Sequence, residues 1–269
     1  MKIAILGSSL RFDILSSQLT LSGYEVINYS RVDEIPEKLE QDIIVLPIPT
    51  KTKEGFLNIG GDSKITPEAL LSRTKAEALI ISCNYNDNRR KTIDINKDEY
   101  FAFLNAVPTA EGAISIALKE KGMTMYKAKC LIIGFGRIGK ILAHRLDGLK
   151  SNITVAARNP KDLALIKALG LKGINIYNLE EAINEYDIIF QTVPSPILTE
   201  NVLSKVDKGT TIIELSSAMA GTDTLKAKEL DLKVINAGGL PEKCAPLTAG
   251  MILFDSVTRI IKENHYAKN

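Results

Sequence analysis

The chain has 269 residues, enough for one large domain or two of ordinary size, and its 45% hydrophobic content can fill the core of either. This composition excludes a disordered chain. Lys and Arg number 34 against 32 Asp and Glu, so the net charge of +2 gives no basic surface of the kind that nucleic-acid binders carry. The numbers favour a folded protein that acts on small molecules and has no nucleic-acid partner.

The three cysteines and the N-terminal residues bear on the compartment. Cys83, Cys130 and Cys244 are odd in number, widely spaced and set in apolar contexts, which indicates reduced thiols rather than a disulfide framework or a metal site. The apolar run in MKIAILGSSLRFDIL is too short and too early for a signal peptide, and no segment approaches about 18 consecutive apolar residues. We expect a soluble, cytoplasmic protein with no membrane contact and no metal.

Short β-branched runs alternate with helical stretches at the start of the chain. The expected strands are residues 2–7, 24–30, 42–48 and 78–83. Alternation at this spacing predicts parallel βαβ units with helices on both faces of the sheet. We assign residues 1–107 to this N-terminal α/β domain.

A second series of such runs follows. Its expected strands are residues 130–134, 153–158, 173–178, 187–193, 210–216 and 232–237. Six strands with intervening helices make a Rossmann sheet by themselves. The predicted fold is therefore α/β, with two Rossmann-like domains of parallel sheet and a cleft between them as the natural ligand site. The second domain is assigned to residues 122–249.

Two further segments connect these domains. In PTAEGAISIALKEKG a proline at the start and a glycine at the end bracket a helix, which predicts a connecting helix over 108–121. GGLPEKCAPLTAG, rich in Gly and Pro, is expected to be a loop. MILFDSVTRIIKEN then has the apolar spacing of an amphipathic helix. We expect this C-terminal helix, over 250–269, to pack back on the first domain.

The stretch LIIGFGRIGKILAHRL carries a glycine-rich turn between an expected strand and an expected helix. Such a turn alone is weak evidence, but its context matches a dinucleotide site, since a second strand follows about 20 residues later. Gly134 permits the tight turn, Gly136 lets the backbone approach a pyrophosphate, and Gly139 lets helix and strand pack closely. The helix start, at Arg137 and Ile138, offers backbone N–H groups to the anion.

The end of the second strand of this series bears on the choice of dinucleotide. An NAD enzyme usually places Asp or Glu there to bond the ribose 2′-hydroxyl, whereas this chain has Ala157, Arg158 and Asn159. An arginine can pair with a 2′-phosphate, and a bond of about 1.5 to 3 kcal/mol would favour NADP roughly ten- to a hundredfold. NADP is therefore the predicted cofactor. The alternative is that Arg158 is a solvated surface residue.

Loops after the fourth and fifth strands of a Rossmann sheet border its ligand crevice. Thr192, Val193 and Pro194 follow the fourth strand here, and Ser216 follows the fifth. We predict that these residues lie beside the cofactor. The alternative for each is that it only shapes a turn.

Other polar residues are placed to meet a substrate in the cleft between the domains. Lysine, arginine and helix N-terminal amides are the groups that a dicarboxylate needs. The predicted substrate-binding residues are Arg11, Thr50, Lys51, Asn105, Thr109 and Thr248. Lys51 and Lys243 can also be read as ordinary surface charges.

The histidines narrow the chemistry. Only His144 and His265 exist, and neither is placed where a general base should be, which disfavours a 2-hydroxyacid dehydrogenase. No serine has a credible histidine partner, and no cluster of His, Cys and Asp has metal-ligand spacing. Hydrolase and metalloenzyme functions are therefore disfavoured.

Several longer motifs are more specific than the glycine-rich turn. They are KIAILG, DIIVLPIPTKTKEG, PTAEGAI, GFGRIGK, TVPSPIL, IIELSSAMAGTD and LPEKCAPLTAG, in that order. Through them the chain resembles the A subunit of dipicolinate synthase over nearly its whole length. The resemblance implies a cytoplasmic, NADP-linked enzyme in the mother cell of a spore-forming bacterium. It implies oxidation of a cyclic lysine-pathway intermediate, a tetrahydro- or dihydrodipicolinate, to pyridine-2,6-dicarboxylate. It also implies that the partner is a flavoprotein-like B subunit, within an oligomer.

The chain departs from the family pattern at two places. Family members read SRPGGTD where this chain has SAMAGTD at 217–223, and APKTAG where it has APLTAG at 245–250. An arginine and a lysine, both suited to bind a carboxylate, are thus absent. Either they are not substrate ligands, or Lys243 and Arg11 replace them, or the substrate of this member has shifted.

The expected reaction is hydride transfer to the nicotinamide, driven by aromatisation of the pyridine ring. A proton must also leave the ring, and Glu111 and Lys243 are the candidate catalytic residues. Two other functions stay open. One is another NADP-dependent two-domain dehydrogenase or imine reductase, and the other is a non-catalytic NADP-binding scaffold protein.

Overall fold

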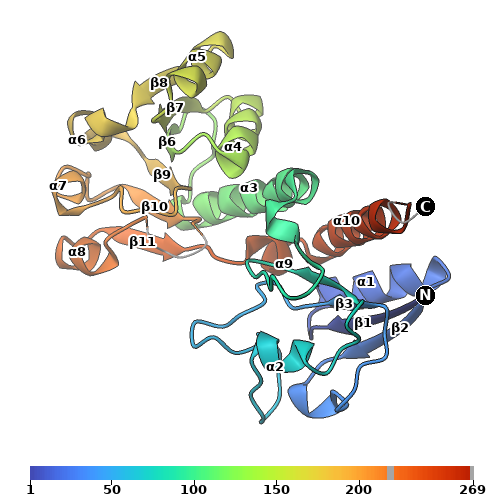
Figure 1. The fold of residues 1–269 in the computed structure, drawn as a ribbon. Helices are drawn as coiled ribbons and strands as arrows, with labels where there is room; N and C mark the ends of the chain where they lie inside the picture. The colour runs from blue at the N-terminus through green and yellow to red at the C-terminus, as the bar shows by residue number, and fades with distance from the viewer. Residues whose placement is uncertain (217–220, 267–269) are drawn as a thin grey trace. The chain divides into compact units, whose positions relative to one another are not determined.

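The computed structural model describes residues 1–216 and 221–266. The chain divides into two compact units, one made of Met1–Asn105 and Ala245–Asn269 and the other of Ala106–Cys244. Each unit contains one parallel sheet with helices packed on it (Figure 1). The predicted α/β fold with two Rossmann-like parallel sheets is confirmed.

The sheet of the first unit has five parallel strands in the order β2-β1-β3-β4-β5. They are β1 (Lys2–Leu6), β2 (Glu25–Tyr29), β3 (Ile43–Val45), β4 (Leu79–Ser82) and β5 (Thr92–Asp94). The central strands β3 and β4 are buried throughout, as continuous apolar runs in a parallel sheet predict. The edge strand β5 is half-buried and was not among the expected strands.

Helices α1 (Leu10–Leu21), α2 (Pro67–Leu71) and α10 (Pro246–Tyr266) complete the first unit, with the short 3-10 turns η1 (Val32–Glu34) and η2 (Ile95–Lys97). Helices α1 and α10 pack so closely that a Cβ at Gly250 would lie 2.6 Å from Ile14 Cβ. Leu253 and Val257 of α10 are fully buried in the core that includes β1 and β3. The expected start at 250 is wrong: the helix begins at Pro246, because proline fits the first turn of a helix.

The sheet of the second unit has six parallel strands in the order β11-β10-β9-β6-β7-β8. They are β6 (Lys129–Ile133), β7 (Asn152–Ala157), β8 (Lys172–Asn175), β9 (Ile188–Gln191), β10 (Thr211–Glu214) and β11 (Lys233–Asn236). All six expected strands are present. The chain order reverses between β6 and β9, which is the switch point where ligands bind in doubly wound sheets.

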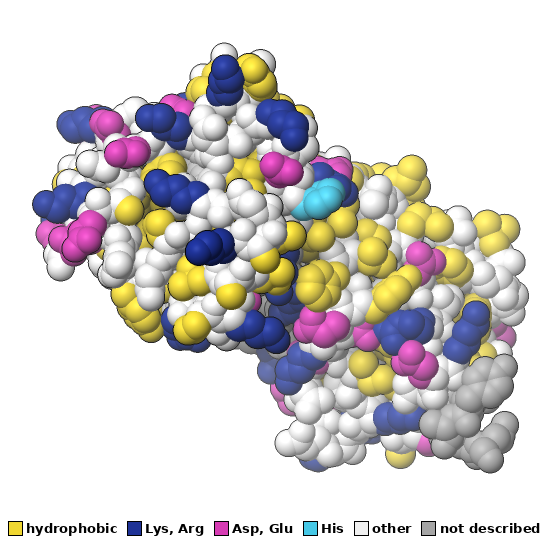
Figure 2. All heavy atoms as spheres, turned by 90° about the horizontal axis from the view of Figure 1, so that it is seen from above, with side chains coloured by type: hydrophobic (Ala, Val, Ile, Leu, Met, Phe, Trp, Pro, Cys, Tyr) yellow, Lys and Arg dark blue, Asp and Glu magenta, His cyan; other side chains and the backbone are white. Residues whose placement is uncertain are grey.

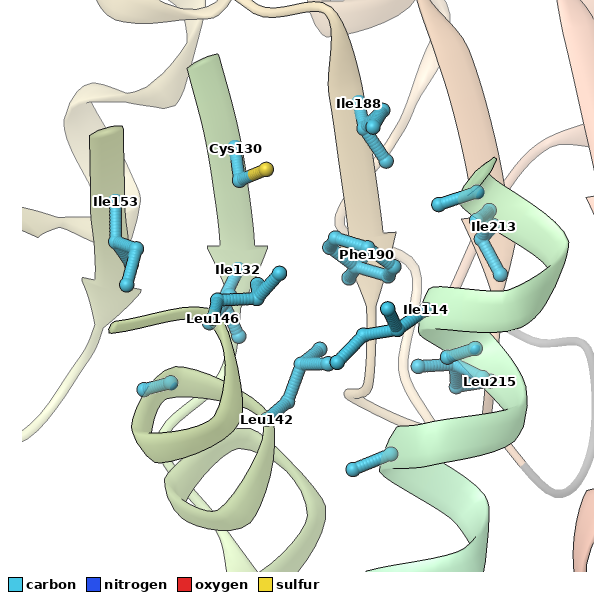
Figure 3. Close-up of a cluster of buried hydrophobic side chains, with 14 of the residues drawn as sticks. Ile114, Cys130, Ile132, Leu142, Leu146, Ile153, Ile188, Phe190, Ile213 and Leu215 are labelled. Carbon is cyan, nitrogen blue, oxygen red and sulfur yellow. The ribbon is translucent and has the colours of Figure 1, made fainter. Parts of the chain in front are cut away.

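Helices cover both faces of this second sheet. They are α4 (Arg137–Gly148), α5 (Pro160–Ala168), α6 (Leu179–Ala182), α7 (Glu200–Leu203), α8 (Thr224–Glu229) and α9 (Leu240–Cys244), with 3-10 turns η3 (Ile176–Asn178) and η4 (Ile183–Glu185). On one face, Leu142 of α4 and Ile114 of α3 (Glu99–Lys121) reach toward Ile132 and Phe190 of the sheet (Figure 3). This packing fixes α4, and with it the glycine-rich turn, against the strands.

Helix α3 (Glu99–Lys121) differs from the expected connecting helix over 108–121. It begins at Glu99, with Pro108 inside it, so the expected start at Pro108 is wrong. A proline in a helix interior removes one backbone hydrogen bond and the helix can continue past it. The stretch expected to be a loop after 237 also contains the helix α9.

Among residues 1–216 and 221–266, α3 is the helix that meets the length and hydropathy criteria of a membrane span. Half of its apolar window is buried inside the protein. Ala110, Ala113 and Ala117 of α3 belong to the core of the second unit, so its apolar character is explained by packing against the sheet.

Charges on the surface are mixed. Figure 2 shows Lys and Arg side chains interspersed with Asp and Glu on the face in view, in keeping with the near balance of 34 basic and 32 acidic residues. On the face in view, interspersed charges of both signs give no single-sign field.

Candidate functional site

A cleft of about 570 Å³ lies at the carboxyl ends of β6, β7 and β9, all within the second unit. Its walls are Gly134, Phe135, Gly136, Ala157, Arg158, Asn159, Asp162, Ile176, Tyr177, Thr192, Val193, Pro194, Ser195 and Ile197. The glycine-rich turn, the end of the second strand and the loop after the fourth strand therefore border one cavity. This is the place where the reversal of strand order predicts a ligand.

Three glycines of the turn have different surroundings. Gly134 has a φ of +100°, and a Cβ on it would lie 2.5 Å from Thr192 Oγ1. A Cβ on Gly139 would lie 2.1 Å from the Gly134 carbonyl oxygen. A Cβ on Gly136 would meet nothing within 4 Å. Gly134 and Gly139 thus serve close packing, whereas Gly136 leaves open space on the side of the cleft.

Helix α4 begins directly after Gly136, which is its N-cap and has no side chain to cap it. The amides of a first helical turn have no partner within the helix, and the helix dipole adds partial positive charge there. Arg137 and Ile138 supply this first turn. Open space at Gly136 in front of uncapped amides fits the pyrophosphate of a dinucleotide.

The ends of β7 and β8 supply the next wall of the cleft. Arg158 is exposed and has no hydrogen bond or ion pair with any other described residue. Asn159 is the N-cap of α5, where its Oδ1 accepts from the Lys161 amide at 2.9 Å. Asp162 is half-buried in the first turn of α5, and Tyr177 is 74% exposed after β8. Arg158, Asp162 and Tyr177 thus line the same cleft.

Asp162, Ile176 and Tyr177 are among the residues of this cleft that were not predicted from the sequence. Ile176 and Tyr177 follow the third strand of the second series, so the rule that loops at strand ends border the crevice could have found them. Asp162 lies one helical turn beyond such a loop. Its position could be recognised only once the placement of α5 is known.

The loop after β9 forms the opposite wall. Thr192 Oγ1 donates to the Ile133 carbonyl at 2.8 Å, which ties this loop to the end of β6. The Val193 amide donates to Gln191 Oε1 at 2.9 Å, and Pro194 follows it along the wall. These bonds hold the loop in place before any ligand binds.

Ser216 ends the described part of the loop after β10. It is buried, its amide donates to Glu214 Oε1 at 3.0 Å, and its Oγ has no hydrogen-bond partner among the described residues. The first four residues of SAMAGTD, at 217–220, lie outside the described residues. The position of the missing arginine is among them.

The two candidate catalytic residues are held by contacts inside the second unit. Glu111 Oε1 on α3 accepts from Arg145 Nε on α4 at 3.1 Å. Lys243 on α9 donates from its Nζ to the Gly238 carbonyl at 2.7 Å. Neither residue lines the cleft at the glycine-rich turn.

Three of the candidate substrate ligands lie in the first unit near strand ends. Arg11 is 3% exposed in the first turn of α1. Thr50 is fully buried, donates from its Oγ1 to the Pro47 carbonyl at 3.0 Å and accepts from the Cys83 amide at 2.8 Å. Lys51 Nζ pairs with Glu68 Oε1 at 2.8 Å. The hydrogen bond from Lys51 lowers the pKa of Glu68.

The other candidate substrate ligands are divided between the units. Asn105 on α3 and Thr248 in the first turn of α10 belong to the first unit, whereas Thr109 on α3 belongs to the second. Thr109 is buried and Thr248 is exposed. The first unit therefore contains Arg11, Asn105 and Thr248 but not Thr109.

The cysteines are free thiols, and two of them are buried. Burial raises the pKa of Cys83 to about 12, an effect that Asp94 reinforces and Arg11 opposes. Burial likewise raises the pKa of Cys130 to about 12. Cys244 is exposed. The part of the chain that the structure describes contains no group of three or more His, Cys, Asp and Glu residues that could hold a metal ion.

Known proteins share both the sequence and the fold of this chain. The A subunit of dipicolinate synthase from Bacillus subtilis (strain 168) is 31% identical over 287 residues, a match that covers 98% of this chain and 96% of the relative. The chain belongs to the family of dipicolinate synthase A subunits. The resemblance found in the sequence motifs is thereby confirmed.

Solved structures from this family agree with the assignment. The A subunit from Bacillus subtilis superposes with a TM-score of 0.86 at 29% identity, covering 99% of this chain and 97% of that chain. The A subunit from Bacillus halodurans superposes with a TM-score of 0.84 at 25% identity, covering 96% of this chain and 97% of that chain. The fold described above is therefore the fold of the dipicolinate synthase A subunits.

The second unit has a further match. Residues 129–218 match the family model described as NADP oxidoreductase, coenzyme F420-dependent. An NAD-dependent formate dehydrogenase from Staphylococcus aureus, solved in complex with NAD, superposes with a TM-score of 0.61 at 17% identity, covering 100% of this chain and 97% of that one. At that identity the likeness concerns the fold alone. This member of the dipicolinate synthase family thus carries a pyridine-nucleotide oxidoreductase domain.

Proposed function

We propose that this chain is the A subunit of a dipicolinate synthase, which uses NADP to oxidise a dihydro- or tetrahydrodipicolinate to pyridine-2,6-dicarboxylate during sporulation. The observation that carries the proposal is the cleft at the glycine-rich turn. Arg158, which has no partner among the described residues, lies on the wall of this cleft. The cleft lies in a chain that aligns from end to end with a curated A subunit of dipicolinate synthase.

The charge of Arg158 supports NADP over NAD. A guanidinium that has no partner among the described residues can form a bidentate pair with a 2′-phosphate without first breaking a bond to them. Asp162 lies in the wall of the same cleft and opposes this preference by repelling a phosphate. The resulting preference for NADP is the balance of these two charges.

The reaction of a dihydro intermediate balances with one hydride and one proton. A bound NADP would accept the hydride at the nicotinamide C4. The ring becomes aromatic when the proton also leaves, and Glu111 and Lys243 remain our candidates for the group that takes it. To act, Glu111 must exchange its pairing with Arg145, and Lys243 must release the Gly238 carbonyl.

Two carboxylates of the substrate need cationic or N–H partners. Arg11 and Lys51 are the proposed cations. The polar side chains proposed to assist them are Thr50, Asn105, Thr109 and Thr248. Arg11 is buried, so its charge is little screened by water, which strengthens its attraction for a carboxylate.

The relatives are named as subunits, which supports a partner chain for this one. We propose a flavoprotein-like B subunit, assembly into an oligomer, and a location in the cytoplasm of the mother cell. The mixed surface charges support neither a nucleic-acid nor a membrane partner.

The experiment that tests the function uses the purified chain with its B subunit. Freshly prepared cyclic intermediate is added with NADP, and the rise in NADPH absorbance is followed together with formation of pyridine-2,6-dicarboxylate. The matched control replaces NADP by NAD. Absence of both signals with a complex that binds NADP would overturn the proposed reaction.

One observation favours a second candidate function, a dinucleotide-binding scaffold for the B subunit. Both candidate catalytic residues are engaged in internal contacts. A complex in which this chain carries Gly136→Val separates the two functions, because the larger side chain would fill the space in front of α4. Full turnover by that complex would support the scaffold, and loss of turnover would support the catalytic role.

A further inference from the structure

Two polar side chains end neighbouring strands of the second sheet. Gln191 is the last residue of β9 and Glu214 the last of β10, and the two are register partners. They are 0% and 1% exposed. A buried amide and a buried carboxyl reduce stability unless their polar atoms are hydrogen-bonded. The hydrogen bonds of these two side chains therefore show which loop residues they hold in place.

Gln191 connects the loop after β9 with the loop after β10. Its Oε1 accepts from the Val193 amide at 2.9 Å, and its Nε2 donates to the Gly221 carbonyl at 3.1 Å. The same carbonyl accepts from the amides of Ile197 at 3.1 Å and Leu198 at 2.9 Å. Three donors therefore meet at one carbonyl oxygen.

Glu214 holds both flanks of a single segment. Its Oε1 accepts from the Ser216 amide at 3.0 Å, and its Oε2 accepts from Thr222 Oγ1 at 2.6 Å. One carboxylate thus bonds both Ser216 and Thr222. No Lys or Arg among the described residues pairs with Glu214, so its hydrogen bonds carry the stabilisation of the charge.

The space between Gly221 and the Gln191 side chain is also restricted. A Cβ on Gly221 would lie 2.6 Å from Gln191 Nε2, so the backbone can approach the amide only because this residue is glycine. Leu198 and Thr222 also form an isolated parallel bridge. The two loops are joined by backbone and side-chain bonds at the same place.

We propose that Gln191 and Glu214 are positioning residues for the dinucleotide, because they fix the cleft walls at Val193 and Ile197 and the strand end at Ser216. Neither side chain lines the cleft itself, so each acts through the loops it holds. Apolar residues at these two buried positions would avoid the desolvation of polar groups, and what the polar pair adds is a fixed loop geometry. The inference rests only on the part of the proposed function that places a dinucleotide in this cleft.

The test replaces Thr222 by valine, which keeps the shape and removes the hydroxyl that bonds Glu214. We expect the Kd for NADPH, measured by fluorescence titration, to rise at least about tenfold, since the lost bond has a charged acceptor. Thr222→Ser, which keeps the hydroxyl, should bind within about threefold of the original chain.

Thr210 provides a matched control, since it lies just before the start of β10, the strand that ends at Glu214. It is 1% exposed, and its Oγ1 donates to the Tyr186 carbonyl at 2.7 Å. Thr210→Val should therefore lower Tm as Thr222→Val does, yet leave the Kd for NADPH unchanged. Equal changes in Kd for the two valine variants at equal loss of Tm would overturn the inference.

A second variant covers the case in which Thr222→Val fails to fold. Glu214→Gln keeps an acceptor for the Ser216 amide and can donate to Thr222 Oγ1, so it should bind NADPH nearly as the original chain does, whereas Gln191→Met should bind it at least about tenfold more weakly. Equal binding by these two variants would overturn the inference. Failure of the unmodified chain to bind any dinucleotide would instead overturn the proposed function.

Discussion

The first βα turns of the two units have the same topology and different contents. In the first unit, β1 runs through Gly7 into α1, and a Cβ on Gly7 would lie 2.3 Å from the ring of Phe12. Phe12 is 3% exposed and belongs to the core. In the second unit, β6 runs through the glycine-rich turn into α4, and a Cβ on Gly136 would meet nothing within 4 Å.

The two turns show which features any parallel sheet provides and which further feature a nucleotide site requires. Both sheets place a strand end in front of a helix N-terminus, and neither α1 nor α4 has a side-chain cap. An uncapped helix N-terminus is therefore not sufficient to make a pyrophosphate site. In the first unit Phe12 fills the space at the turn, whereas in the second unit that space is open. The volume of side chains at the turn, rather than the topology, decides where a pyrophosphate fits.

The largest expected effect is at Gly139. Because its Cβ would lie 2.1 Å from a backbone carbonyl, Gly139→Ala should lower the free energy of unfolding by about 3 kcal/mol and abolish dinucleotide binding. The control is Gly148→Ala at the end of the same helix, where a Cβ meets nothing within 4 Å and up to about 1 kcal/mol of stability should be gained. Urea unfolding measures both, and equal stability of the two variants would contradict the packing described for Gly139.

The next effect tests the comparison directly. Gly136→Ala should raise the Kd for NADPH about tenfold or more, because the methyl group enters the space proposed for the pyrophosphate. It should lower Tm only slightly, since alanine is a poorer N-cap than glycine. Gly7→Ala should do the reverse, since its methyl group meets the buried Phe12 ring: Tm falls and the Kd stays unchanged. Thermal unfolding and fluorescence titration check both. If Gly136→Ala lowered Tm as much as Gly7→Ala does, or if Gly7→Ala also raised the Kd, the two turns would not differ as described.

Arg158 and Asp162 should shift the choice of dinucleotide in opposite directions. Arg158→Ala should weaken binding of NADPH roughly ten- to a hundredfold and leave that of NADH unchanged, since the lost bond is to the 2′-phosphate. Asp162→Asn removes a repelling charge at a partly exposed position and should strengthen NADPH binding by a few-fold, roughly. Titration of both variants with both dinucleotides measures the preference. An unchanged preference in Arg158→Ala would refute the assignment of NADP through this residue.

The last comparison concerns a property in which the two units should agree. Burial raises the pKa of Cys83 in the first unit and of Cys130 in the second to about 12, from 9.0. The folded state therefore keeps these protons at a pH where the unfolded state loses them. Stability should be constant below about pH 9 and should fall between about pH 9 and about pH 12, by about 1.4 kcal/mol per pH unit and thiol.

Urea unfolding at about pH 8 and about pH 10 measures this slope. Cys83→Ala and Cys130→Ala should each reduce the slope of stability against pH by the contribution of one thiol. Cys244→Ala, at an exposed position, serves as the control. A slope unchanged in both buried variants would show that other groups cause the loss of stability.

Much of the fold could be predicted because buried strands leave a strong pattern. Every strand from β6 to β11 was expected, since short apolar runs alternate with helical stretches along this part of the chain. The missed strand β5 has only three residues, Thr92–Asp94, all half-buried at the sheet edge. A run so short shows no periodicity, and its pairing with β4 is a contact between distant parts of the chain.

Helix starts were harder to predict than strands. Pro108 suggested a helix start, because proline is favoured in the first helical turn. The residues before it, from Glu99, form a helix all the same, since Phe101 and Ala106 bury apolar surface that offsets the hydrogen bond lost at the proline. Tertiary packing thus outweighed the local preference of proline for the first turn of a helix.

The candidate site also has a part that the sequence predicted and a part that it did not. Its glycine-rich turn and the strand ends at Arg158 and Val193 could be located from the sequence, because strand ends define the edge of a parallel sheet. The pairing of Glu111 with Arg145 joins α3 to α4, and the bonds of Gln191 and Glu214 join two loops. Such contacts depend on the packing of separate elements, which no local pattern encodes.

The order of folding during synthesis follows from the division of the chain. The first unit is discontinuous, since it needs α10 from the end of the chain, whereas the second unit is one continuous stretch, Ala106–Cys244. Leu253 and Val257 of α10 fill the core against β1 and α1, so that core is incomplete until the last helix leaves the ribosome. Domains generally fold as units while the chain is made. The nucleotide-binding unit, encoded in the middle, can therefore be finished first, and the N-terminal strands must wait for the C-terminus.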